Sequence, residues 1–355
     1  MPVNMTVRIG ALDLKNPIIC GSGEQVMTAA GIRAALAAGA GAVIAKSTNE
    51  SDAARQQLDG TDYARLSHDL DILSWDQPHQ ISDYLFCRSG LAPVDPKAWL
   101  AEIGQLDQEA ARAGAYVAAS IIPADFDQAL KLAAFADQQG IRIIELNIGA
   151  PHGTEAAKGA IMVEKDSDRV RSGVQEMRAV VSGALWIKLT GNSDNIADLA
   201  LAAKQGGADA VVMMGRAIAF LPNLDTMEPV LGTNAGYGGN WSLPLTCRWL
   251  AASRRLLGID TPLIGTNGVR GGLDAARMML SGASAIEMTS AIITGGFGVL
   301  TDTINELEGY LASKDCDAVD IVGVAADKLS GYGDQKARPG YWKNFVPPET
   351  LSDDK

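Results

Sequence analysis

Eight short apolar runs recur along this 355-residue chain, and their alternation with a second kind of segment constrains the fold. The intervening segments carry apolar residues at helical spacing, as in residues 126–139, 167–181, 195–204 and 273–281. Apolar strands that alternate with amphipathic helices indicate a parallel sheet buried on both faces, and eight such units favour closure. We therefore predict an α/β fold, a (βα)8 TIM barrel with an N-terminal hairpin and long loops at its C-terminal face. A doubly wound open sheet is the alternative. The predicted strands are 16–21, 41–46, 115–120, 141–147, 184–189, 208–214, 262–266 and 284–289.

The length fits a single barrel domain, residues 1–355, enlarged by insertions. Residues 47–92 and 215–240 are too long for simple connections, and both follow predicted strands, where a barrel builds its active face. We expect them to form the walls and lid of a site. Residues 315–355 are rich in charge and carry several prolines, and we expect them to form a C-terminal tail that lies over the barrel.

The net charge of −12 argues against binding to nucleic acid or to an anionic membrane, because either requires a basic surface. No apolar run approaches the roughly 18 residues that span a bilayer. The N-terminus lacks the layout of a signal peptide, so a cytoplasmic protein is expected. The four cysteines form no CxxC pair, so neither an iron–sulfur cluster nor a zinc site is predicted, and we expect no metal.

Two lysines stand inside predicted strands, where an unpaired charge is unfavourable. Lys46 and Lys188 suit a bound anion or an electron-rich ring, although a lysine whose amine reaches solvent past the strand end explains either one alone. Glycines and hydroxyl residues follow the late strands, at residues 236–240, 265–268 and 289–290. Barrels commonly hold a phosphate group at that place, so these segments together favour a phosphate-bearing ligand.

A series of motifs occurs in an order that is more specific than any one of them. They are NPIICGSG, GAVIAKST, ELNIGAPHG, LWIKLTGN, GGADAVVMMG, GYGGNWS and PLIGTNGVRGG with its continuation to Ser290. The series resembles the dihydroorotate dehydrogenase superfamily over about residues 7–295. The Pro151-His152-Gly153 ending of the third motif is most similar to the pyrimidine-reducing domain of dihydropyrimidine dehydrogenases.

This resemblance implies a barrel that binds FMN. The residues implied at the isoalloxazine ring are Gly21, Ser22, Gly23, Lys46, Ser47, Asn147 and Lys188. Of these, Lys188 would stabilise negative charge on the reduced flavin. Lys46 would lie at the edge of the ring and is also a candidate catalytic residue. The residues implied at the phosphate are Gly239, Asn267, Gly268, Thr289 and Ser290, with Asn267 standing where the family usually has a glycine.

The substrate side departs from the family pattern, in which Asn-x-Ser-Cys-Pro-Asn carries the cysteine or serine that exchanges a proton with substrate. Here Gly149 and Ala150 replace the Ser-Cys pair, and His152 takes the place of the second asparagine. The sixth strand ends in Gly215 and Arg216, where the family has an asparagine followed by serine or threonine. Residues 87–93 have lost both asparagines of a substrate loop. Each polar group of a pyrimidine left unpaired would cost about 1 to 3 kcal/mol. We therefore predict that neither dihydroorotate nor uracil is the substrate.

Other residues must then carry the chemistry. His152 titrates near neutrality and is the first candidate for proton transfer, although relatives that keep their cysteine also contain Pro-His-Gly. Cys87 is a second candidate, against its alternative as an inert buried thiol. Arg216 and Arg88 are predicted to clamp a carboxylate or phosphate of the substrate, and a plain surface arginine is the alternative for each.

Three functions remain open. The leading one is an FMN-dependent oxidoreductase that acts on a non-pyrimidine small molecule by hydride transfer at flavin N5. Because no cluster cysteines are present, a soluble electron acceptor or donor, or a separate partner, must complete the cycle. The second is a flavin reaction that needs no base, such as an oxygen-dependent one, and the third is a non-catalytic FMN-binding paralogue. The resemblance also implies a homodimer.

Overall fold

Eight parallel strands close into a barrel in the computed structural model, which describes residues 2–149 and 164–351. The closed ring runs in the order β10-β11-β14-β15-β3-β4-β8-β9, so the predicted barrel is confirmed and the open-sheet alternative is wrong. Each of the eight predicted strands has its counterpart. The barrel strands are β3 Ile18–Cys20, β4 Ala42–Ile44, β8 Tyr116–Ile121, β9 Ile143–Asn147, β10 Ala184–Lys188, β11 Ala210–Met213, β14 Leu263–Thr266 and β15 Ala283–Met288.

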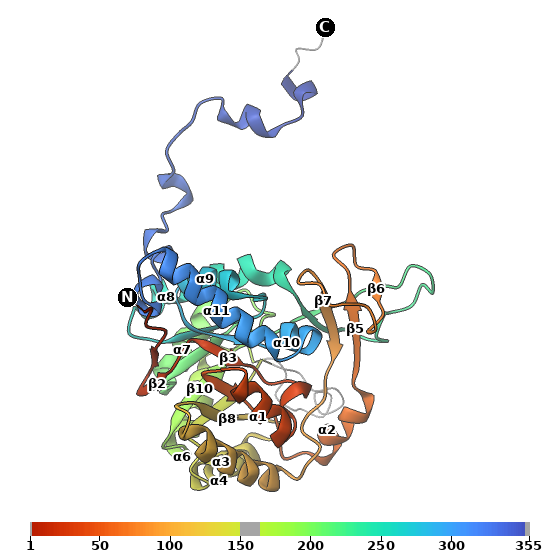
Figure 1. Cartoon of the computed structure of the whole chain (residues 1–355), viewed down its shortest axis with the longest axis vertical. Coiled ribbons are helices and arrows are strands. Elements are labelled where there is room, and N and C mark those ends of the chain that lie inside the picture. The colour runs from red at the N-terminus through yellow and green to blue at the C-terminus, as the bar shows by residue number, and fades with distance from the viewer. Residues whose placement is uncertain (1, 150–163, 352–355) are drawn as a thin grey trace.

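Helices surround the barrel and cover the outer face of the strands (Figure 1). Several begin at a side-chain cap, because Thr28, Asp95, Asp125 and Asp166 each accept a hydrogen bond from a backbone N–H of the first turn. The helices around the barrel are α1 Ala29–Ala37, α3 Pro96–Ala111, α4 Phe126–Gln138, α6 Ser167–Val180, α7 Ile196–Gly206, α8 Leu243–Leu257, α9 Gly272–Leu280, α10 Ser290–Gly295 and α11 Gly298–Ser313.

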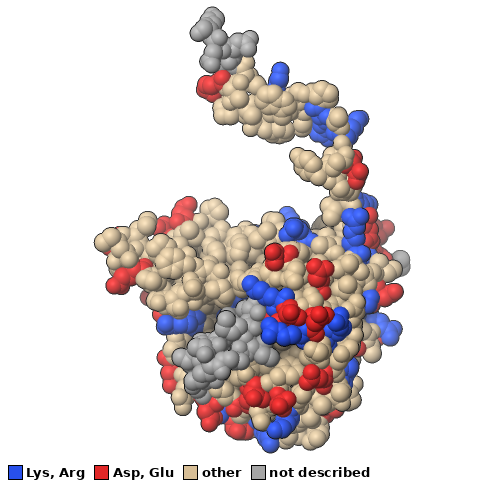
Figure 2. Space-filling view, turned by 180° about the vertical axis from the view of Figure 1, so that it is seen from behind, with Lys and Arg blue, Asp and Glu red and all other residues tan. Residues whose placement is uncertain are grey.

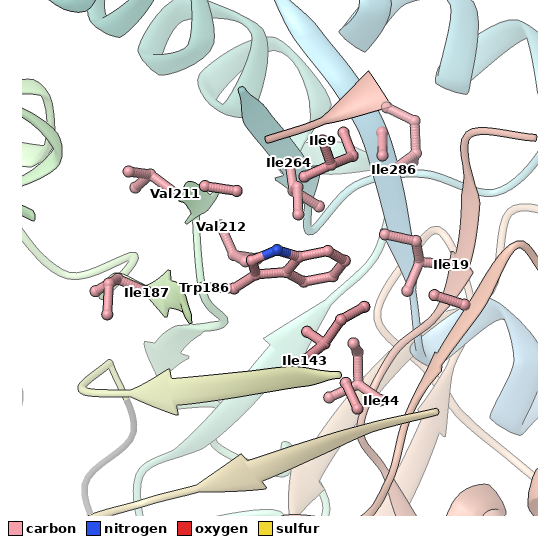
Figure 3. Packing of buried hydrophobic residues seen from close by; sticks show 14 of the residues in the cluster. Ile9, Ile19, Ile44, Ile143, Trp186, Ile187, Val211, Val212, Ile264 and Ile286 are labelled. Carbon is pink, nitrogen blue, oxygen red and sulfur yellow. The ribbon is translucent and has the colours of Figure 1, made fainter. Parts of the chain in front are cut away.

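An antiparallel hairpin formed by β1 (Val7–Ile9) and β2 (Leu12–Leu14) precedes the barrel, as predicted. Its turn uses Gly10 with φ of +61°, a conformation that glycine adopts without strain. Ile9 is fully buried and belongs to the same apolar core as Ile264 of β14, and both are labelled in Figure 3.

The barrel interior is apolar at one level and charged at the next. Figure 3 shows Trp186 at the centre of the packed interior, while its neighbour Ile187 points away from it. Because side chains alternate along a strand, the next inward position on β10 after Trp186 is Lys188. On β9 the same two-residue step leads from Ile143 to Glu145. The charged level therefore lies directly beneath the C-terminal ends of the strands.

The two long insertions join into one antiparallel sheet in the order β12-β13-β7-β5-β6. The first insertion also carries the short helix α2 (Asp52–Gln56). The sheet has its own apolar cluster, which includes Leu66, Phe86 and Leu231. Sequence reasoning predicted the insertions as walls but not that they pair with each other. The strands are β5 Asp62–Leu66, β6 Ile72–Leu73, β7 Tyr84–Arg88, β12 Ala217–Ala219 and β13 Ala235–Gly238.

The C-terminal tail packs on the barrel only over its first part. Ala318 and Ile321 are buried, and Asp327 accepts two hydrogen bonds of 2.8 Å from Arg254 of α8. Residues 329–351 extend away from the barrel (Figure 1), and Tyr332 is 99% exposed. This differs from the expected tail lying over the barrel. The 3-10 turns beyond Leu329 span only three to five residues each and are too short to form an apolar face.

Acidic and basic side chains are interspersed over the face shown in Figure 2, which is the reverse of the view in Figure 1. Within the described ranges, no helix combines the length and the apolar character needed to cross a membrane. The same ranges contain no group of three side chains suited to hold a metal ion.

Candidate active site

A cavity opens at the C-terminal ends of the barrel strands and is walled on one side by the inserted sheet. It encloses about 1010 Å³ of space, part of it continuous with solvent. Barrel residues and residues of β5, β7 and β13 line it together, so the predicted role of the insertions as walls agrees with the geometry. The predicted site residues that line it are Ser22, Gly23, Lys46, Ser47, Cys87, Asn147, Lys188, Arg216, Asn267, Gly268, Thr289 and Ser290.

Four predicted residues do not line the cavity or are not described. Gly21 lies just behind the wall, where an added Cβ would collide with Thr289 Oγ1 and Glu287. Gly239 has φ of +148°, and a Cβ there would run into the ring of Tyr84. His152 lies outside the described residues, as does Ala150.

Arg88 is the fourth, and its predicted role as a substrate clamp is not supported. Cys87 and Arg88 are consecutive in β7, so their side chains point to opposite faces of the sheet. Because Cys87 lines the cavity, Arg88 faces away from it and donates to the carbonyl of Leu231 at 3.3 Å. Its nearest carboxylate is that of Asp62, 3.9 Å away.

Lys46 is held by a carboxylate that sequence reasoning missed. Its ammonium donates to Glu24 Oε1 at 2.9 Å, while the Tyr63 hydroxyl donates to the other carboxylate oxygen and Gly90 N donates to Oε1 at 3.2 Å. Burial lowers the pKa of Lys46, and Glu24 offsets this only in part. Burial alone would raise the pKa of Glu24, but Lys46 and the Tyr63 hydroxyl hold it below its ordinary value. The two side chains form an ion pair that is largely buried.

Lys188 lies between two buried carboxylates, Glu145 of β9 and Glu287 of β15. Its ammonium is 3.5 Å from Glu145 Oε2 and closer to Glu287 Oε1. Burial alone would lower the pKa of Lys188, but Glu145 and Glu287 hold it above its ordinary value. Burial raises the pKa of Glu145 to about 7; Lys188 opposes this rise and Glu287 adds to it.

A row of serine hydroxyls connects this cluster to the cavity surface. Ser120 Oγ donates to Glu145 Oε1 at 2.9 Å and lies 2.9 Å from Ser47 Oγ. Ser47 Oγ in turn lies 3.0 Å from Ser22 Oγ, and both Ser47 and Ser22 line the cavity. Sequence reasoning named Ser22 and Ser47 but not Ser120.

Neutral donors also line the cavity. Asn267 Nδ2 is buried and has no hydrogen-bond partner among the described residues, although Asn267 lines the cavity. Gly268 has φ of +110° and packs so closely on Leu243 that a side chain would not fit. An unpaired buried donor beside Thr289 and Ser290 fits a group with several acceptor oxygens, such as a phosphate.

Arg216 is the cation of the cavity wall that has no carboxylate partner in residues 2–149 and 164–351. Its guanidinium donates to Ser89 Oγ at 2.5 Å and lies 3.7 Å from Cys87 Sγ. It stands three residues after the end of β11. The arginine and the thiol form a cationic and polar patch on the side of the cavity walled by the inserted sheet.

The sequence is similar to known enzymes over most of its length. Residues 81–311 match the family described as dihydroorotate dehydrogenase. The chain is 30% identical to the catalytic subunit of dihydroorotate dehydrogenase B (NAD(+)) of Methanocella arvoryzae, over 91% of this chain and 98% of that protein. The corresponding subunit of Pyrococcus horikoshii is 29% identical over 90% of this chain and 97% of its own length. The NAD-dependent dihydropyrimidine dehydrogenase subunit PreA of Escherichia coli is 27% identical over 59% of this chain and 53% of that protein.

Proposed function

The chain belongs to the dihydroorotate dehydrogenase family, and from that premise we propose that it is an FMN-dependent oxidoreductase acting on an anionic small molecule other than a pyrimidine. The observation that carries the substrate proposal is Arg216, a cavity arginine that is without a carboxylate partner among the described residues. A guanidinium binds carboxylate or phosphate through paired N–H donors.

Two groups of cavity residues support FMN as the cofactor. Lys46 and Lys188 lie near the ends of two barrel strands and each has N–H donors beyond those used by their carboxylates. Asn267 Nδ2 and the hydroxyls of Thr289 and Ser290 suit the phosphate. When bound, a flavin supplies hydride exchange through its N5 atom. The residues of the chain would position the ring and balance its charge.

The cavity offers few side chains that could recognise a pyrimidine by hydrogen bonds. Among the described residues that line it, only Asn147 and Asn267 carry a side-chain amide, and we assign Asn267 to the phosphate. Where relatives of this superfamily have an asparagine followed by serine or threonine at the end of the sixth strand, this chain has Gly215 and Arg216. A pyrimidine would therefore leave carbonyl and N–H groups unpaired, at about 1 to 3 kcal/mol for each one buried.

Proton transfer needs a residue other than Ala150. We propose His152 for this role, with Cys87 as the second candidate, since its thiol lines the cavity beside Arg216. We also propose a soluble electron acceptor or donor, a homodimer and a cytoplasmic location. The relatives named above as catalytic subunits support a separate electron partner.

The test is an absorption spectrum of the purified protein, followed by anaerobic photoreduction and a screen for compounds that reoxidise it. The panel pairs carboxylates and phosphates with neutral analogues, and it includes orotate and uracil. We expect a flavin spectrum and reoxidation by one class of anionic, non-pyrimidine compounds. A protein that takes up no FMN would overturn the cofactor proposal. Efficient reoxidation by orotate or uracil would overturn the substrate proposal. A flavin that no compound except oxygen reoxidises would favour the base-free alternative.

Replacing Lys46 by alanine is expected to raise the Kd for FMN about 10- to 100-fold, because a charge-assisted hydrogen bond contributes about 1.5 to 3 kcal/mol. Fluorescence titration of the apoprotein with FMN measures this. Lys97→Ala removes an exposed lysine of α3 that lies over Phe135, and it should leave the Kd unchanged. An unaltered Kd in Lys46→Ala would remove Lys46 from the proposed role.

A further inference from the structure

Three ionisable side chains are buried together at the floor of the cavity. Glu145 is 0% exposed and Glu287 is 1% exposed, and both carboxylates contact the single ammonium of Lys188. The three come from β9, β10 and β15, at inward positions just above the apolar level that contains Trp186. Two carboxylates thus share one cation.

The surroundings of Glu145 provide no second cation within the described part of the chain. On the neighbouring strands, β8 contributes the Ser120 hydroxyl and β10 contributes Lys188. Across the barrel, β15 contributes Glu287, and β3 contributes Cys20, a thiol whose pKa burial raises to about 12. Among the remaining strands, Lys46 stands two residues after the end of β4 and pairs with Glu24, and β14 ends at the neutral Thr266.

With all three groups ionised, the cluster carries one uncompensated negative charge. An uncompensated charge is unfavourable in a buried site, and a carboxylate there relieves it by binding a proton. Glu287 lies closer to the ammonium than Glu145 does, so Glu145 is the carboxylate left to bind that proton. The raised pKa of Glu145 agrees with this assignment.

The cluster is also connected to the cavity. Lys188 and Glu287 line the cavity themselves, and the hydroxyl row from Ser120 through Ser47 to Ser22 leads from Glu145 to the same surface. Negative charge added in the cavity would therefore act on Glu145 at short range, in a site of low dielectric.

On the premise that the cavity holds FMN as proposed above, we infer that Glu145 is a proton acceptor coupled to the charge of the flavin. For every two electrons that a reductant delivers, one proton enters the flavin and Glu145 takes up a second from solvent, becoming a neutral carboxyl. Oxidation returns both protons. The positive charge of Lys188 is already paired with Glu287, so it cannot also balance the negative charge added to the flavin. Protonation of Glu145 removes one negative charge from the cluster and so balances the added one.

Spectroelectrochemical titration of the FMN-loaded protein between pH 5.5 and pH 8.5 tests this inference. Each proton taken up with two electrons changes the midpoint potential by 29.6 mV per pH unit. Above about pH 7, where Glu145 is ionised in the oxidised protein, we expect the slope of two protons in the wild type and of one proton in Glu145→Gln. The two potentials should agree at pH 5.5 and diverge as the pH rises.

Glu287→Gln provides a second variant. In it Lys188 pairs with Glu145 alone, so Glu145 should stay ionised in both the oxidised and the reduced protein. It should also show the one-proton slope. Glu109→Gln removes an exposed carboxylate that pairs with Arg33, and it should behave as the wild type. Equal slopes in FMN-loaded wild type, Glu145→Gln and Glu287→Gln would overturn this inference while leaving the proposed function intact. Failure of the wild type to take up FMN would overturn both.

Discussion

Replacing Lys188 by methionine is expected to lower the free energy of unfolding of the apoprotein by about 3 to 5 kcal/mol at pH 8. Glu145 and Glu287 would remain buried without the cation that both contact. Methionine has a similar length and leaves no large cavity, so the loss would come from charge and not from packing.

The pH dependence of the unfolding free energy shows whether the loss of stability comes from charge. A carboxyl whose pKa is higher in the folded than in the unfolded protein binds more protons when folded, so stability falls as pH rises between the two values. For Glu145 in the wild type this interval runs from 4.5 to about 7. Lys188→Met should show a steeper fall over this interval and above it, and a smaller loss at pH 5 than at pH 8, because Glu145 is protonated at pH 5.

Urea denaturation followed by circular dichroism at pH 5 and pH 8 measures the effect. The matched control introduces Lys188→Met into a protein that already carries Glu145→Gln and Glu287→Gln, and there the substitution should have little effect at either pH. A loss in Lys188→Met that is equal at pH 5 and pH 8 would show that the buried charges are not its cause.

Replacing Trp186 by alanine is expected to cost about 3 to 5 kcal/mol at any pH between 5 and 8. Trp186 is fully buried at the centre of the barrel, with Ile143 and Ile264 near it (Figure 3). These residues project from different strands of a closed ring, so they cannot collapse into the space that the indole leaves. The variant retains a cavity.

Two further variants test whether the destabilisation comes from the lost ring volume, from a lost hydrogen bond, or from the loss of any tryptophan. The indole N–H of Trp186 has no acceptor among the described residues, so Trp186→Phe loses volume but no hydrogen bond and should be clearly less destabilised. Trp342 is 56% exposed in the tail, and Trp342→Ala should match the wild type in urea midpoint. If Trp186→Ala unfolded at the wild-type midpoint, the interior packing described above would be wrong.

The barrel was predictable because its signal is local. A buried parallel strand needs an apolar run, and a helix that covers it needs apolar residues at helical spacing, so each element is readable within its own window. This explains why all eight strands were found. The inserted sheet was not predicted as a sheet, because β7 pairs with β13, a partner about 150 residues further along the chain, and no local pattern encodes a partner.

The lysines of the candidate site were predicted from the sequence, but the glutamates that pair with them were not. Lys46 and Lys188 stand out as charges within apolar runs, whereas Glu24, Glu145 and Glu287 become relevant only when distant strands close into a ring. The inward position of Glu145 could nevertheless have been predicted from the sequence. It is two residues before Asn147 and two after Ile143, so it shares their face of β9. The same two-residue rule, applied to Cys87, would have placed Arg88 on the opposite face of β7.

The pairing of β7 with β13 has a consequence for engineering the substrate range. One strand supplies Cys87 and the other supplies Gly236, which lie opposite each other in the register and both line the cavity. A loop graft that exchanges residues 47–92 alone would remove half of a hydrogen-bonded ladder and leave the edge of the other half open. Donor segments for both insertions must therefore come from the same parent protein, and a chimera that mixes parents should lose the cavity wall before it gains a new specificity.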